Sequence, residues 1–273
     1  MPTDVRKLTL HRPRSLTAAL VMLRDDQALT PIAGCTDVMV GLHFGTAPQR
    51  QFLDLWGLDE LRGIRAVKDR LQIGALTTFT ELIASPLVRK RVPMLVAASK
   101  EVGGAQIQNR GTLGGNIANA SPAGDTLPVL AAADARVILR SADGQRSVAF
   151  EDYYTGYRTS VIQPGELIAA IEIPAIDGRQ WWRKVGTRRA QAISKVMMAG
   201  VRGAEVRVAI GSVAPTVVRA ANAESVLTRG GSIGEAQAAL LAEIAPIDDI
   251  RSTGRYRLEV AANLLAAFWR DTD

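Results

Sequence analysis

Fifteen consecutive residues in the middle of the chain, 111–125, read GTLGGNIANASPAGD and hold four glycines, two asparagines, a serine, a threonine and an aspartate. An ordinary turn needs one or two residues that tolerate a positive φ angle, so a turn alone does not explain this composition. Bare backbone followed by small hydrogen-bonding side chains is typical of a loop that wraps a ligand, although a tight loop without a ligand can look the same. The rest of the chain has to decide between them.

A second candidate site lies nearer the N-terminus. The segment LTPIAG predicts a strand that enters a turn at Gly34, and Thr36 or Asp37 is placed to cap a short helix at 38–45. The first amides of a helix have no partner within the helix, and the helix dipole favours negative charge. Two such segments favour one ligand held by both, with backbone amides directed at a pyrophosphate. A dinucleotide fits this arrangement better than a mononucleotide.

Several kinds of site are excluded by what the sequence lacks. Neither segment has the GxGxxG spacing of a Rossmann site, which argues against a nicotinamide nucleotide there and leaves room for a flavin in another fold. Cys35 is the only cysteine, and the two histidines, His11 and His43, lie far apart in apolar contexts. We therefore expect no metal site, no iron–sulfur cluster and no histidine-based catalytic centre in this chain.

The chain has 273 residues, of which 47% are hydrophobic, and this length favours two or three compact units. Their patterns alternate between strand and helix signals. Strands are expected at 7–11, 29–34, 51–55 and 71–77, in a hairpin at 135–150 with Asp143 and Gly144 at the turn, before Pro174, and in a meander at 204–220. Helices are expected after Ser15 and at 38–45, 78–85, 93–103, 126–134, 232–244 and 255–270.

The formal net charge is +6, and the basic residues are concentrated between Arg179 and Arg207, where Glu205 is the only acid. This stretch permits an anionic ligand or an acidic partner, and a solvated sheet face explains it equally well. Only Trp181 and Trp182 are nearby aromatics, so we expect no nucleic-acid binding. The N-terminus has no apolar signal region, and no apolar run approaches the roughly 18 residues of a membrane helix. We expect a cytoplasmic protein without a membrane partner.

Four segments in the same order resemble the FAD-binding subunits of the molybdenum hydroxylases: PIAGCTDVMV, QNRGTLGGNIANASPAGDTLPVL, YYTGYRTSVIQPGELIAAIEIP and RKVGTRRAQAISKVMMAG. The resemblance covers nearly the full length, and the last two segments place it closest to the bacterial xanthine dehydrogenase FAD-binding subunit. It implies an α+β fold of the vanillyl-alcohol-oxidase or PCMH type at 1–176, with two α+β subdomains at about 1–55 and 56–176. A C-terminal domain of antiparallel sheet and helices, of the carbon monoxide dehydrogenase flavoprotein type, is implied at 177–273.

The resemblance also implies which residues bind the cofactor, FAD, between these units, and it implies no catalytic residue. These residues are Ile32, Ala33, Gly34, Cys35, Thr36, Asp37, Val38, Val102, Thr112, Gly114, Gly115, Asn116, Asn119, Asp125, Ile168 and Lys184. The first seven form one pyrophosphate loop, and those from Thr112 to Asn116 form a second. Asn119 and Asp125 bind further FAD hydroxyls, Ile168 lies beside the isoalloxazine ring, and Lys184 lies near the flavin.

Three positions depart from the family pattern. Cys35 stands where many relatives have glycine, so either its φ is negative or the turn carries strain. Val102 aligns with an aromatic residue that stacks near the flavin in vertebrate xanthine dehydrogenases. Gln191 and Ala192 replace acidic residues found near the flavin in those enzymes, which leaves the identity of the electron acceptor open.

The implied function is the last step of an electron chain that runs from a molybdenum centre through two iron–sulfur clusters and FAD to NAD or another acceptor. The implied partners are a molybdopterin-binding large subunit and a [2Fe-2S] small subunit, assembled as a dimer of heterotrimers. Purine catabolism follows if the complex is a xanthine dehydrogenase. Because the molybdenum subunit selects the substrate, a complex that oxidises another N-heterocycle, an aldehyde or carbon monoxide is the alternative. A scaffold protein that has lost flavin binding is the alternative of a different class.

Overall fold

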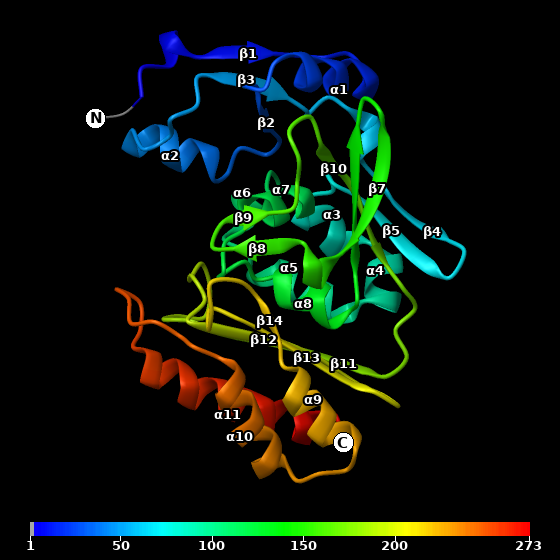
Figure 1. Ribbon diagram of the computed structural model, residues 1–273, viewed down its shortest axis with the longest axis vertical. Coiled ribbons are helices and arrows are strands. Elements are labelled where there is room, and N and C mark those ends of the chain that lie inside the picture. Colours follow the sequence, from blue (N-terminus) through cyan, green and yellow to red (C-terminus); the bar gives the residue numbers. More distant parts are fainter. Residues whose placement is uncertain (1–2) are drawn as a thin grey trace.

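The computed structural model describes residues 3–273, and its three main sheets follow one another along the long axis of the molecule (Figure 1). The first unit holds a three-stranded parallel sheet in the order β1-β3-β2. Its elements are η1 (Val5–Lys7), β1 (Thr9–His11), α1 (Leu16–Asp25), β2 (Thr30–Ile32), α2 (Val38–Phe44), β3 (Gln51–Asp54) and η2 (Asp59–Leu61). Parallel neighbours need crossover connections, and α1 and α2 supply segments of these connections.

Helix α1 forms where the sequence predicts it. The Ser15 hydroxyl accepts a hydrogen bond from the Ala18 amide at 3.1 Å, and the Glu60 carboxylate accepts one from the Leu16 amide at 2.9 Å. These two acceptors satisfy amides that the first turn of a helix leaves without partners. Leu16, Ala19, Leu20 and Leu23 are buried at helical spacing, so one apolar face of the helix packs in a cluster with Leu53 of β3 and residues of the second unit's sheet.

The second unit is built on a five-stranded antiparallel sheet in the order β4-β5-β10-β6-β7. Its strands are β4 (Ile64–Val67), β5 (Arg70–Gly74), β6 (Arg136–Ser141), β7 (Gly144–Ala149) and β10 (Leu167–Ile173), beside a ribbon of β8 (Tyr154–Gly156) and β9 (Thr159–Ser160). Its helices are α3 (Phe79–Ala84), α4 (Pro86–Arg91), α5 (Pro93–Glu101), α6 (Ala105–Gln108), α7 (Leu113–Asn119), α8 (Leu127–Ala132) and η3 (Phe150–Asp152).

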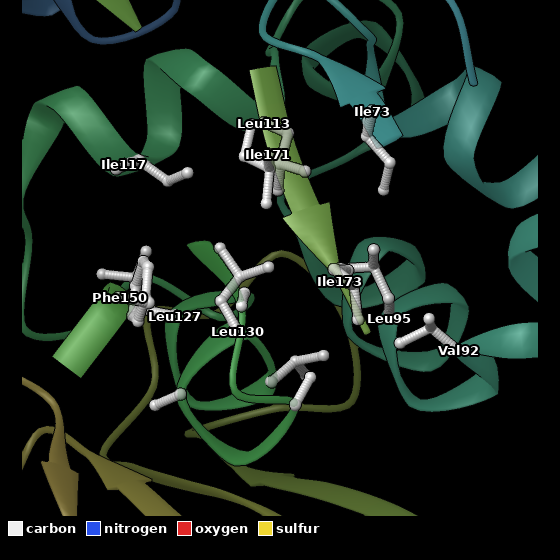
Figure 2. Packing of buried hydrophobic residues seen from close by; sticks show 14 of the residues in the cluster. Ile73, Val92, Leu95, Leu113, Ile117, Leu127, Leu130, Phe150, Ile171 and Ile173 are labelled. Atoms are coloured by element: carbon white, nitrogen blue, oxygen red, sulfur yellow. The ribbon is translucent and has the colours of Figure 1, made fainter. Parts of the chain in front are cut away.

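The core of the second unit lies between this sheet and its helices. Figure 2 shows Leu113 and Ile117 of α7 directed into the same apolar cluster as Leu127 and Leu130 of α8 and Ile171 of β10. All of these side chains are at most 1% exposed. Helix α7 is therefore anchored by its apolar side, which leaves its glycines and asparagines for the other side.

The third unit is a four-stranded antiparallel sheet in the order β11-β12-β13-β14, covered by three helices. Its elements are β11 (Arg179–Val185), β12 (Val196–Arg202), β13 (Val206–Gly211), β14 (Val218–Arg219), α9 (Ala221–Thr228), α10 (Ile233–Glu243) and α11 (Gly254–Asp271). On β12, Val196 and Met198 face the cluster of α9–α11, whereas Ala199 and Val201 face the core of the second unit. Side chains alternate along a strand, so burial on both faces explains why VMMAGV is an unbroken apolar run.

Three expectations about local structure need correction. Residues 111–125 are not one loop, because α7 occupies residues 113–119 within them. Asp37 is the N-cap of α2, but neither its side chain nor that of Thr36 caps the helix. In the hairpin, Ser141 pairs with Gly144, so the turn is at Ala142 and Asp143. The expected α+β fold class is confirmed by this arrangement together with the family matches below. Within residues 3–273, no helix has the length and hydrophobicity needed to cross a membrane.

Candidate functional site

A cavity of about 1450 Å³ lies where the three units meet. Ligand pockets usually measure about 300 to 1000 Å³, so this cavity can hold an extended ligand. Its walls come from the β2–α2 loop, α7, β10 and the loops of the third unit. All of the expected site residues line it except Lys184, and Gln191 and Ala192 line it too.

The loop from β2 to α2 forms one wall and presents its backbone to the cavity. Among the described residues, the amides of residues 34–38 donate to no protein acceptor. A Cβ on Gly34 would lie 1.7 Å from the carbonyl oxygen of Arg110, so only glycine allows the loop to pack against the start of the Gly-rich segment. The loop therefore offers several adjacent donors in a fixed position, as an anion site requires.

Cys35 adopts a φ of 62°, so of the two expected possibilities the turn is the one that carries strain. A left-handed residue with a Cβ costs roughly 1 to 2 kcal/mol. The Cys35 thiol lies 3.4 Å from the Ala33 carbonyl oxygen. Burial raises the pKa of this thiol, and the Asp54 carboxylate adds to the effect, so the thiol stays neutral at ordinary pH. A neutral thiol is a poor nucleophile, which disfavours covalent attachment of a flavin here.

The Gly-rich segment forms the facing wall, but it does so as a helix whose amides are already used. Thr112 Oγ1 accepts from the Gly115 amide at 3.0 Å, the Thr112 carbonyl accepts from Asn116, and the Ala75 carbonyl accepts from Gly114. A Cβ on Gly114 would lie 2.6 Å from the Ala75 Cβ. The expectation of a run of bare amides is therefore wrong for this segment. Its glycines let α7 pack closely, and its contribution to the cavity is shape and side chains.

The two walls are joined by side chains of α7 and of the segment YYTGYR, residues 153–158. Asn119 Nδ2 donates to Asp37 Oδ1 at 3.1 Å, which ties the end of α7 to the first loop. Arg158 donates to both the carbonyl and the side-chain oxygen of Asn119, and the Tyr154 hydroxyl donates to the Ile117 carbonyl at 2.9 Å. Sequence reasoning did not assign a role to Tyr154 or Arg158, although both stand in a segment that it singled out. They fix the C-terminal end of α7.

Asp125 sits at the back of the cavity in a closed hydrogen-bond group. Its Oδ2 accepts from Lys184 Nζ at 2.7 Å and its Oδ1 accepts from Ser194 Oγ at 2.5 Å, while its carbonyl accepts from Trp182 Nε1. The Lys184 ammonium also donates to the Glu101 carbonyl at 3.0 Å. Burial raises the pKa of Asp125, and the Lys184 charge and the hydrogen bonds from Lys184 and Ser194 oppose that rise. Lys184 itself lines a second cavity behind Asp125.

The third unit closes the cavity with residues that sequence reasoning did not assign. Arg257 of α11 is buried; it donates to the Lys195 and Ser212 carbonyls at 3.0 and 2.8 Å and pairs with Asp249 at 2.7 Å. These bonds hold the ends of β12 and β13 against the loop before α11. Arg257 lies far along the chain from every segment that sequence reasoning singled out. No sequence signal separated it from other helix arginines.

Comparison with known proteins shows which protein family the chain is similar to. Residues 6–176 match the FAD binding domain in molybdopterin dehydrogenase, and residues 182–272 match the CO dehydrogenase flavoprotein C-terminal domain. The glyceraldehyde dehydrogenase medium chain of Sulfolobus acidocaldarius is 32% identical over 259 residues, covering 91% of this chain and 92% of the relative. The carbon monoxide dehydrogenase medium chain of Hydrogenophaga pseudoflava is 30% identical over 269 residues, covering 93% of each chain.

Two further comparisons agree with these. The xanthine dehydrogenase FAD-binding subunit of Escherichia coli O157:H7 is 30% identical over 264 residues, covering 92% of this chain and 90% of the relative. The solved structure of carbon monoxide dehydrogenase from Hydrogenophaga pseudoflava superimposes with a TM-score of 0.91 at 27% identity, covering 97% of this chain and 96% of that one.

Two α+β subdomains and a sheet-and-helix domain around a large cavity, together with these matches, define a flavoprotein of the FAD-binding oxidoreductase class. The chain belongs to the FAD-binding subunits of the molybdenum hydroxylase family. The expected cofactor, FAD, is thereby confirmed. Relatives named for glyceraldehyde, carbon monoxide and xanthine lie within 30–32% identity. The four motifs therefore identify the family, and they do not single out its xanthine dehydrogenase members.

The residues present fit FAD. The free amides of residues 34–38 are adjacent hydrogen-bond donors, which complement the negative charge of a pyrophosphate. Apolar side chains such as Val102, Ile107 and Ile168 line other parts of the cavity and suit a flat ring. Asn116, Asn119 and Ser121 add polar groups for sugar hydroxyls. The cavity therefore combines the apolar walls and the few placed polar groups typical of cofactor sites.

Proposed function

We propose that this chain is the FAD-binding electron-transfer subunit of a xanthine dehydrogenase-type molybdenum hydroxylase. In this proposal, a partner subunit with [2Fe-2S] clusters delivers electrons, a molybdopterin-binding large subunit oxidises the substrate, and NAD or another acceptor takes the electrons away. The three chains assemble as a dimer of heterotrimers in the cytoplasm. The observation that carries the proposal is the large cavity between two domains that both match this family.

The assignment of the individual site residues belongs to the same proposal. Bound FAD supplies a ring that accepts and releases electrons, and this chain binds, orients and shields it. The amides of residues 34–38 hold the pyrophosphate, Asn116 and Asn119 bind sugar hydroxyls, and Val102 and Ile168 pack on the ring. Asp125 binds the cofactor's hydroxyls, and its carboxylate has a fixed orientation because Lys184 and Ser194 donate hydrogen bonds to its two oxygens.

Lys184 acts on the flavin through Asp125 in this account. Its side chain is only 6% exposed, and its ammonium is already hydrogen-bonded to Asp125 and to the Glu101 carbonyl. The positive charge still contributes to the field inside a poorly solvated site, where charges are weakly screened. It therefore favours the more negative, reduced state of the cofactor, and Lys184→Met lowers the flavin potential. Redox titration of both proteins in the same buffer tests this, and equal potentials would remove Lys184 from the site.

The proposal is tested with the complex that assembles around this chain. The chain carries an affinity tag in its native host, and the copurified complex is analysed for subunit masses, molybdenum, iron and FAD. Turnover is then compared on xanthine, another N-heterocycle, an aldehyde and carbon monoxide, with NAD and with an artificial dye as acceptor. Turnover of xanthine with NAD supports the full proposal.

Other results separate the parts of the proposal. Activity restricted to an aldehyde, to carbon monoxide or to another heterocycle would overturn the xanthine dehydrogenase assignment while leaving the FAD subunit intact. This is the alternative that the relatives named for glyceraldehyde and carbon monoxide favour. A scaffold protein without flavin requires an empty cavity, and a purified complex with molybdenum and iron but no FAD would establish that function instead.

A further inference from the structure

A second cavity of about 670 Å³ lies on the other side of Lys184, between α5, β11 and the loop that follows β11. Six cationic side chains line it, and Glu101 is its only acidic lining residue. The cations are Arg89, Lys100, Arg183, Lys184, Arg188 and Arg189. Of the six, only Lys184 and Arg188 hydrogen-bond to residues that line the FAD cavity, Asp125 and Gln191, so that cavity does not account for this concentration of charge.

Two of the six cations are paired with carboxylates, and the other four are exposed and have no carboxylate partner among the described residues. Lys184 pairs with Asp125 at 2.7 Å and Arg183 pairs with Asp271 at 3.1 Å. Within residues 3–273, Arg89, Lys100, Arg188 and Arg189 have no carboxylate within 4.0 Å, and the contacts of Arg89 and Arg188 are with backbone carbonyls. Like charges around one cavity repel each other, and a bound anion relieves that repulsion. The arrangement therefore points to a ligand with several negative charges.

The other residues that line this cavity indicate which further chemical groups a ligand here would carry. Pro93, Val96 and Ala97 of α5 and Trp182 of β11 supply apolar surface to the same cavity. The Trp182 indole is held in place by its hydrogen bond to the Asp125 carbonyl at 3.2 Å. Planar guanidinium groups recognise phosphate oxygens in pairs, and an indole ring gives a flat apolar surface for a base. The volume lies within the usual range for a nucleotide-sized ligand.

We propose that this second cavity binds a nucleoside diphosphate, with its phosphates on Arg188, Arg189 and Lys100 and its base against the apolar surface of α5 and Trp182. The site adjoins the FAD cavity at Ala192, which lines both, and it does not depend on which substrate the complex oxidises. Lys184 and Trp182 both bond to Asp125, so a ligand here contacts residues that also hold the wall of the FAD cavity. Occupancy therefore changes the absorption spectrum of bound FAD.

The probes are ADP, pyrophosphate and adenosine, titrated by calorimetry into the FAD-loaded chain at low salt. We expect ADP to bind more tightly than either fragment and to perturb the flavin spectrum without releasing FAD. The double variant Arg188→Gln/Arg189→Gln is expected to weaken ADP binding at least tenfold and to keep its FAD. The matched control Arg14→Gln/Arg229→Gln removes the same charge from exposed positions elsewhere and is expected to leave ADP binding unchanged.

Four outcomes would overturn the proposal. If ADP displaces FAD, it binds in the first cavity. If pyrophosphate binds as tightly as ADP, the site recognises phosphate and not a nucleotide. If both double variants weaken ADP equally, net charge alone explains the binding. If the copurified complex no longer binds ADP, the partner subunits cover the cavity and its cations serve a protein interface.

Discussion

Replacing Lys184 by methionine tests the buried group behind the FAD cavity. Methionine keeps most of the side-chain volume and removes the charge, while Asp125 stays in place. The two side chains are 6% and 9% exposed and their charged atoms are 2.7 Å apart. Removing one partner of such a buried pair costs about 3 to 5 kcal/mol, because the other charge is left without compensation. We expect a loss of this size in the free energy of unfolding near pH 8.

The loss depends on pH in a direction that follows from Asp125. Burial already raises its pKa in the parent, and the Lys184 charge opposes that rise, so Lys184→Met raises the pKa further. A carboxyl with a raised folded pKa holds a proton that the unfolded chain has released. Its contribution to stability is complete below the unfolded pKa, about 3.9, and is lost as the pH rises through the folded pKa. The variant is therefore expected to lose less stability at pH 5 than at pH 8.

Urea unfolding of the apoprotein at pH 5 and pH 8 measures both effects. The control is Lys100→Met, which removes an exposed lysine from the same region and is expected to change stability by no more than about 0.5 kcal/mol. Adding Asp125→Asn to Lys184→Met removes the uncompensated charge, so this double variant is expected to regain part of the loss at pH 8. A loss below about 1 kcal/mol at both pH values, or no recovery in the double variant, would refute the reasoning.

Three further changes probe the walls of the cavity. Gly115→Val is expected to weaken FAD binding at least a hundredfold because its side chain would enter the cavity, and to lower the unfolding midpoint because its Cβ would lie 2.8 Å from Thr112 Oγ1, which caps α7; Gly234→Val, with open space around it, is the control, and full FAD occupancy would show that Gly115 does not face the cofactor. Gly34→Ala is expected to destabilise the fold and abolish FAD binding because of its 1.7 Å approach to a carbonyl oxygen, and normal melting would contradict that close contact. Cys35→Gly relieves a positive φ and is expected to change stability by no more than about 1 kcal/mol while keeping FAD; loss of flavin would show that the thiol is needed.

Local patterns predicted the elements that bury one regular apolar face. Helix α1 has its cap at Ser15, α10 has its capping box at Ser232 and Glu235, and the meander expected at 204–220 forms as the antiparallel pair β13 and β14. Each of these signals depends on residues within one turn or one strand. They could therefore be interpreted without knowledge of the rest of the molecule.

Helix α7 could not be predicted in this way because its sequence, LGGNIAN, has poor helix propensity. It forms because Leu113 and Ile117 enter the core of the second unit and because the Tyr154 hydroxyl and Arg158 hold its end. These are tertiary contacts. Propensity is a weak preference that packing overrides, so a segment rich in glycine and asparagine was expected to be a loop.

The sequence predicted which residues line the site better than it predicted how each of them contributes to it. Sequence motifs selected residues that almost all line one cavity, but they did not show that the amides of the first loop are free while those of α7 are used. The link from Lys184 to Asp125 spans 59 positions in the chain. Such pairings depend on how the units pack, and no spacing within one segment encodes them.

Hydrogen exchange measured with and without FAD tests the central claim most directly. We assign the cofactor's pyrophosphate to the free amides of residues 34–38, whereas the amides of residues 113–116 already donate within the chain. We predict that FAD slows exchange strongly in peptides covering residues 34–38 and much less in those covering residues 113–116. FAD-dependent protection confined to residues 113–116, with residues 34–38 unchanged, would contradict the account.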